Sequence, residues 1–174
     1  MASVQPRPLP IDALLARYAG PADGAYTDCF VTEAAGEVSL PSFVEAFCTG
    51  RVFRLERLLI RALFGKSGTD RLARRLALGE IQAFSAWRVE ARTPDQLLMR
   101  EIISHKTRLW LKVEPLTDGT APRTRLYFGT AVLPVEAGAN GAPRMSVLFN
   151  LLWFHRLYAR VLLSGARARL ARMV

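Results

Sequence analysis

Residues 108–114 read Arg-Leu-Trp-Leu-Lys-Val-Glu, and residues 124–132 read Thr-Arg-Leu-Tyr-Phe-Gly-Thr-Ala-Val. In the first segment Leu109, Leu111 and Val113 alternate with more polar positions, which is the period of a strand with one buried face. The second segment repeats the alternation, and a stretch that contains Gly and Pro separates the two. The pair therefore predicts two neighbouring antiparallel strands.

Three further strands are expected around this pair. Residues 26–33 form the first, and residues 84–91 and 96–103 precede the quoted segments. The second face of the strand at 108–114 is predicted to be the wetter one. It carries Arg108, Trp110, Lys112 and Glu114. An antiparallel sheet combined with helices elsewhere in the chain gives the α+β class.

Three helices are predicted before the later strands, in addition to a short one at residues 11–18. The S-x-x-E spacing of Ser42 and Glu45 is that of a capping box, which places a helix start near Phe43. Residues 51–64 follow as an amphipathic helix, and Thr69 is expected to cap the third. The sheet should therefore carry several helices between its first strand and the later meander.

The helix at 51–64 has two distinct sides when its residues are placed at 100° intervals. Its predicted apolar side carries Val52, Leu55, Leu59, Ala62 and Leu63. Its predicted solvent side carries Arg54, Arg57 and Arg61. We therefore expect the leucines to pack inward and the arginines to point outward.

A long final helix is expected from Arg144 to about Arg172, lying against the sheet. The side predicted to meet the sheet carries Val147, Leu151, Phe154, Tyr158, Val161, Leu162 and Gly165. Its first half is also apolar on the opposite side, through Met145, Phe149 and Trp153. This second patch needs a cover, which the sequence leaves open among the earlier helices, a bound ligand and a second subunit in a homodimer.

Composition and charge narrow the class of protein. The 174 residues, 51% of them hydrophobic and 22% charged, suit a single globular domain over 1–174, with residues 1–10 as an extended lead-in. The opening residues do not resemble a secretory signal, so a cytoplasmic location is expected. Cys29 and Cys48 are expected to be buried thiols. The net charge of +9 favours nucleic acid, an anionic membrane or an acidic partner without choosing among them.

Motifs for catalysis and cofactors are missing from the sequence. Gly65-Lys66-Ser67 lacks the earlier glycine of a phosphate loop, because position 60 is Ile60. Neither a dinucleotide fingerprint nor a nucleophile elbow is present. His105 and His155 are the only histidines and have no local ligand partners, so no metal or other cofactor is expected.

The order of strand, helices, antiparallel meander and long final helix resembles the START-like helix-grip superfamily, which includes polyketide cyclases and lipid-transfer proteins. More particular segments also resemble bacterial proteins of this type. They are 95–99, 108–115, 124–132 and 154–158. The resemblance implies a curved sheet that wraps the last helix, and members of the superfamily commonly hold a hydrophobic molecule between the two. It implies no catalytic residue for this chain.

Three classes of function follow, and the first is expected to apply. It is non-catalytic binding of a small hydrophobic ligand that has one polar end, held between the sheet and the last helix. The predicted lining residues are Trp87, Met99, Leu111, Phe128, Phe154 and Tyr158. The alternatives are a protein or nucleic-acid interaction module that uses basic helix faces, and a cavity enzyme in which His155 and Glu101 act as acid and base.

Overall fold

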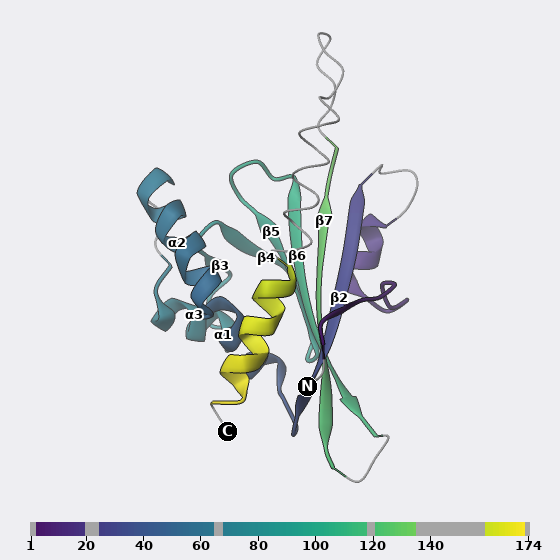
Figure 1. The fold of residues 1–174 in the computed structure, drawn as a ribbon. Helices are drawn as coiled ribbons and strands as arrows, with labels where there is room; N and C mark the ends of the chain where they lie inside the picture. The colour runs from purple at the N-terminus through teal and green to yellow at the C-terminus, as the bar shows by residue number, and fades with distance from the viewer. Residues whose placement is uncertain (1–2, 20–24, 65–67, 118–120, 135–158, 173–174) are drawn as a thin grey trace.

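The computed structural model describes residues 3–19, 25–64, 68–117, 121–134 and 159–172. It shows a seven-stranded, fully antiparallel open sheet in the order β1-β2-β7-β6-β5-β4-β3, with α-helices on one face (Figure 1). The strands are β1 (Gln5–Pro6), β2 (Tyr26–Ala35), β3 (Ala83–Phe84), β4 (Trp87–Arg92), β5 (Gln96–Glu101), β6 (Thr107–Leu116) and β7 (Arg123–Val132). The predicted α+β class is confirmed.

Strands β6 and β7, which contain the two quoted segments, form the centre of the sheet. They pair antiparallel from Thr107 with Val132 to Leu116 with Arg123. The first of the predicted strands, β2, pairs along the whole length of β7. The predicted strand at 84–91 is divided into β3 and β4 by a tight turn, in which Ser85 has a φ of 54°. The extended lead-in joins the sheet, because Gln5 of β1 pairs with Val31 of β2.

The helices are α1 (Leu40–Cys48), α2 (Arg51–Phe64), α3 (Asp70–Ala77) and a C-terminal helix whose described part covers 159–170. They cover the sheet face seen on the left of Figure 1. Their inward side chains share one core with that face. Examples are Phe47 and Phe128, whose rings lie 5.1 Å apart between centroids. Cys29 and Cys48 are both buried, as predicted.

The predicted wet face of β6 is wrong, because the N-terminal segment covers it. The 3₁₀-helix η1 (Leu14–Tyr18) lies on this side of the sheet, and Leu15 packs there with Trp110. Trp110 is fully buried, and Arg108 and Lys112 are almost so. The two cations form ion pairs, Arg108 with Glu90 at 2.8 Å and Lys112 with Asp12, which offset the cost of their burial.

The predicted sides of α2 are also wrong. Arg57 points inward with only 6% of its surface exposed, and Phe53 is buried beside it. Leu55 is 60% exposed instead. The cause is tertiary: Asp70 at the start of α3 accepts from Arg57 Nη2 at 2.7 Å, and the guanidinium lies 5.6 Å from the Phe84 ring centroid. These partners stabilise a buried cation.

Two smaller predictions about helix ends are tested. Thr69 does cap α3, since its side chain accepts from Leu72 N. The capping box at Ser42 is wrong, because α1 begins earlier and Ser39 is its N-cap, accepting from Ser42 N at 3.3 Å. Glu45 accepts instead from Arg74 of α3 at 3.0 Å, and so links the two helices.

The described part of the C-terminal helix lies on the sheet, as predicted, and Leu162 of its predicted inward side is buried there. Its buried residues are Ala159, Leu162, Leu163, Ala166 and Leu170. Val161, predicted to meet the sheet, is 43% exposed. The predicted inward residues Val147, Leu151, Phe154 and Tyr158, and the patch of Met145, Phe149 and Trp153, lie outside the described residues.

Candidate ligand-binding site

Four of the six predicted lining residues lie together in the main core. They are Trp87, Met99, Leu111 and Phe128, and none is more than 8% exposed. Leu162, Leu163 and Ala166 of the C-terminal helix belong to the same cluster. Over its described part, the interface between sheet and final helix is therefore packed with protein side chains. Phe154 and Tyr158 lie outside the described residues.

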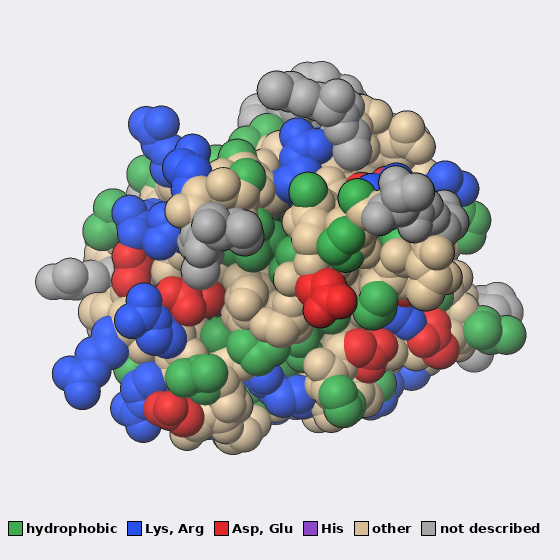
Figure 2. Space-filling view, turned by 90° about the horizontal axis from the view of Figure 1, so that it is seen from below, with side chains coloured by type: hydrophobic (Ala, Val, Ile, Leu, Met, Phe, Trp, Pro, Cys, Tyr) green, Lys and Arg blue, Asp and Glu red, His purple; other side chains and the backbone are tan. Residues whose placement is uncertain are grey.

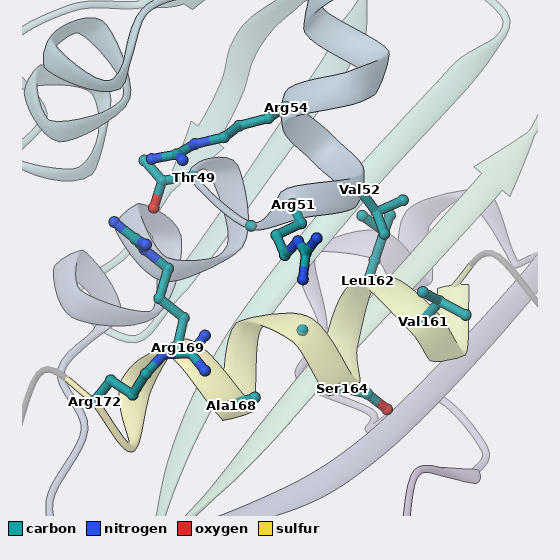
Figure 3. Close-up of a pocket in the computed structure, with 12 residues that line it drawn as sticks. Thr49, Arg51, Val52, Arg54, Val161, Leu162, Ser164, Ala168, Arg169 and Arg172 are labelled. Atoms are coloured by element: carbon teal, nitrogen blue, oxygen red, sulfur yellow. The ribbon is translucent and has the colours of Figure 1, made fainter.

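A pocket of about 410 Å³ lies on the other side of the C-terminal helix, where that helix faces the start of α2. This volume is within the usual range for small-molecule sites. Val52 of α2 and Val161 and Leu162 of the C-terminal helix give it an apolar wall, and Thr49 and Gly50, between α1 and α2, also line it. Figure 3 shows Val52 and Leu162 side by side across the space between the two helices.

Four arginines also line this pocket, two from each helix. They are Arg51 and Arg54 of α2 and Arg169 and Arg172 of the C-terminal helix. The Arg51 side chain points from α2 toward the C-terminal helix (Figure 3). Arg54 is paired with Asp70. Among the described residues the other three arginines have no carboxylate partner, so the pocket carries uncompensated positive charge.

One arginine that lines the pocket, Arg169, has an unmet buried polar atom. Its Nε is buried, and within the described part of the chain it has no hydrogen-bond partner. Buried polar atoms in proteins usually have a partner, and an unmet one costs stability. A carboxylate or phosphate oxygen in the pocket would provide the missing acceptor.

Small residues on the C-terminal helix leave the pocket open. A Cβ atom built on Gly165 would meet no other atom within 4 Å, so a side chain at this position would extend into free space. Glycine in the middle of a helix destabilises it by about 0.5–1 kcal/mol relative to alanine. Gly165 therefore weakens the helix at a position where packing does not require a glycine.

A second pocket of about 750 Å³ lies along another side of the same helix, against the end of β2. It is larger, but its charges are mixed, because Glu33 and Glu37 line it together with Arg167. Arg167 lies 3.5 Å from the hydroxyl of Thr32. The pocket at α2 has the more distinctive chemistry, since its described lining holds four arginines and no carboxylate.

Of the predicted acid-base pair, only Glu101 lies within the described residues, so the pairing with His155 stays a prediction. Glu101 folds back onto the turn after β5 and accepts from the backbone amides of Ser104 at 2.9 Å and His105 at 3.1 Å. Burial alone would raise its pKa, but the Ser104 hydroxyl and the amides outweigh burial and hold the pKa of Glu101 below its ordinary value. Glu101 thus stabilises a turn, and His155 lies outside the described residues.

The sequence did not identify this pocket. The sequence predicts that Val161 and Gly165 lie against the sheet, and of the four pocket arginines it assigns only Arg54 to a side, the solvent side of its helix. One feature of the sequence could have indicated the pocket. Gly165 lies within an arginine-rich predicted helix, where a glycine lowers helix stability and no turn is expected.

The described residues also bear on metal binding and on membrane crossing. In the ranges that the structure covers, no three His, Cys, Asp or Glu side chains gather as a metal site would require. None of the helices described is both long enough and apolar enough to cross a bilayer.

No protein-family model matches the chain, and no curated protein matches it.

Proposed function

We propose that this protein binds a small amphipathic anion, an apolar molecule with a carboxylate or phosphate end, in the pocket between α2 and the C-terminal helix. The observation that carries the proposal is the lining of that pocket, where an apolar wall meets Arg51, Arg169 and Arg172 without a carboxylate partner among the described residues. The apolar part of the ligand would lie on Val52 and Leu162, and its acidic end would accept from the arginines.

The fold supports the same class of function. A seven-stranded antiparallel sheet with a C-terminal helix packed on one face supports a helix-grip arrangement as part of this proposal. The proposed site differs from that of the resemblance, because it lies on the outer side of the helix. The described part of the inner side is occupied by Met99, Leu111 and other core residues.

Binding without catalysis is the simplest reading of the lining. Two hydroxyls line the pocket, that of Thr49 at the end of α1 and that of Ser164 within the C-terminal helix, and its described lining contains no histidine, cysteine or carboxylate. The Thr49 hydroxyl is already committed, since it donates to Glu45 O at 2.7 Å. Arginine remains protonated at neutral pH and serves as a charge partner for an anion.

Calorimetric titration tests the proposal with three ten-carbon probes: decanoate, decanol and decyltrimethylammonium. Decanoate should bind saturably, decanol more weakly, and the cation least. The variant Arg51→Gln/Arg172→Gln should weaken decanoate binding at least about tenfold, because hydrogen bonds to charged groups contribute about 1.5–3 kcal/mol each.

A matched control is Arg71→Gln/Arg88→Gln, which removes the same charge from exposed positions outside the pocket. It should leave decanoate affinity close to that of the wild type. Equal loss in both double variants would show a nonspecific effect of net charge and would overturn the proposal. So would equal affinity for decanoate and the cationic probe.

A further inference from the structure

The outward face of α2 exposes large apolar side chains. Leu55 and Leu58 are 60% and 61% exposed, and Arg51 and Ala62 on the same side are also exposed. Residues three and four apart share one side of a helix, so these four positions form a continuous strip. We call Arg51, Leu55, Leu58 and Ala62 the outer strip of α2.

The fold holds the outer strip in this orientation. On the opposite side of α2, Phe53 is 1% exposed, and its ring stacks on Phe84 at 6.4 Å. Arg57 is anchored there by Asp70 at 2.7 Å. Rotating α2 to bury Leu55 and Leu58 would expose Phe53 and break the buried Arg57 pair, which is costly. The exposure of the leucines is therefore built into the packing of α2.

The surroundings of the outer strip are basic. Arg51 belongs to the strip and Arg54 flanks it, while the C-terminal helix places Arg169 and Arg172 across the pocket that Arg51 lines. The C-terminal helix from 159 to 172 contains four arginines and no acidic residue. Figure 2 shows Lys and Arg side chains projecting along the edge of the molecule on the side where α2 and α3 lie, with Asp and Glu side chains among them. The partner should accordingly be anionic.

The exposed leucines favour a lipid surface over nucleic acid as the anionic partner. Nucleic-acid phosphates would engage the arginines but leave Leu55 and Leu58 in water, since phosphate contacts are ionic and polar. An anionic bilayer uses both features, because leucines enter the boundary between headgroups and acyl chains while arginines contact the headgroups. We propose that the outer strip of α2 is a docking surface for an anionic lipid bilayer.

The position of Arg51 connects this surface with the pocket. Arg51 belongs to the outer strip and also lines the pocket, so a docked protein would hold the pocket beside the lipid headgroups. A lipid-derived amphipathic anion is then the ligand that would reach the pocket directly. This connection rests on the proposed function, whereas docking itself requires only the outer strip.

Vesicle co-sedimentation tests the docking. Wild-type protein should sediment with vesicles of phosphatidylcholine and phosphatidylglycerol, and much less with phosphatidylcholine alone. The variant Leu55→Ser/Leu58→Ser should partition at least about tenfold less into the anionic vesicles. Raised salt should weaken the wild-type interaction, because ions screen the arginines. Thermal unfolding of each variant verifies that it is folded.

The matched control is Ile11→Ser/Leu78→Ser, which removes two exposed large apolar side chains away from the outer strip. It should sediment like the wild type. Equal sedimentation of the leucine variant and the wild type, or equal affinity for both lipid mixtures, would overturn the proposal. The proposal would also be overturned if the wild type does not bind vesicles but forms a dimer that Leu55→Ser/Leu58→Ser abolishes. The outer strip would then bind a second copy of the chain.

Two further measurements keep this inference separate from the proposed function. Leu55→Ser/Leu58→Ser should retain decanoate binding, because neither leucine lines the pocket. Gly165→Leu, which fills the pocket, should retain vesicle binding. Failure of vesicle binding alone would overturn the docking, and failure of decanoate binding alone would overturn the pocket.

Discussion

Trp110 donates its indole Nε1–H to the side-chain oxygen of Gln96 at 2.9 Å, in the interior of the sheet face that the N-terminal segment covers. The same oxygen accepts from Leu14 N at 2.9 Å, and the Gln96 amide nitrogen donates to Asp12 O at 3.1 Å. One buried side chain thus fastens the N-terminal segment to the middle of the sheet.

Replacing Gln96 with leucine should lower the free energy of unfolding by about 2–4 kcal/mol. The substitution leaves the Trp110 indole and the Leu14 amide buried without an acceptor, and each unmet group costs about 1–3 kcal/mol. Denaturant titration followed by tryptophan fluorescence measures the change. Gln82→Leu, at an exposed position, is the control and should differ from the wild type by less than about 0.5 kcal/mol. Equal effects would contradict the role of Gln96.

Gly129→Ala should destabilise the protein by about 1–3 kcal/mol through overpacking. A Cβ at this position would lie 2.9 Å from Leu15 Cδ2 and 3.0 Å from both Asp28 O and Trp110 Cε3. Adding Leu15→Ala removes one of these clashes, so the double variant should lose less stability than the sum of the two single losses. If the losses in free energy of unfolding from the two single variants are strictly additive in the double variant, Leu15 does not clash with a side chain at position 129.

Glu101→Gln should lower stability at neutral pH, and the difference from the wild type should close as the pH falls. The folded pKa of Glu101 lies below its unfolded value, so its contribution is complete above the unfolded pKa and is lost as the pH falls through the folded one. Thermal unfolding at several pH values from neutral to acidic measures this. A gap independent of pH would contradict the hydrogen bonding described for this carboxylate.

Ser104→Ala is the companion variant for Glu101. It removes the hydroxyl that donates to Glu101 but keeps the backbone amides at Ser104 and His105. The pH dependence of stability should become shallower without disappearing. No change would indicate that the Ser104 hydroxyl contributes nothing to the depressed pKa.

Strands were predictable because their evidence is local. Alternation at Leu109, Leu111 and Val113 predicted β6, and the Gly- and Pro-bearing stretch that follows predicted its antiparallel pairing with β7. The second face of β6 was not predictable in this way. Lys112 reads as a solvent residue until Asp12, a hundred positions away in sequence, is brought to its ammonium group.

Contacts between residues distant in sequence also explain why the sides of α2 and the candidate site were not predicted. Helical periodicity identifies two sides of α2, and side-chain polarity then predicts that the apolar side is buried. Arg57 is buried instead because Asp70 pairs with it and the Phe84 ring lies beside its guanidinium. The pocket arises between residues more than a hundred positions apart, Val52 and Leu162. Neither local period nor composition contains that contact.

Decanoate binding by Gly165→Leu tests the proposed pocket most directly. A Cβ at Gly165 meets nothing within 4 Å, so leucine should occupy the pocket without displacing the core. Replacing a helical glycine should raise stability, by about 0.5–1 kcal/mol for the matched control Gly165→Ala. We predict that Gly165→Leu melts at or above the wild-type temperature and no longer binds decanoate in calorimetric titration, while Gly165→Ala retains binding. A well-folded Gly165→Leu variant that binds decanoate with wild-type affinity would contradict the assignment of the site.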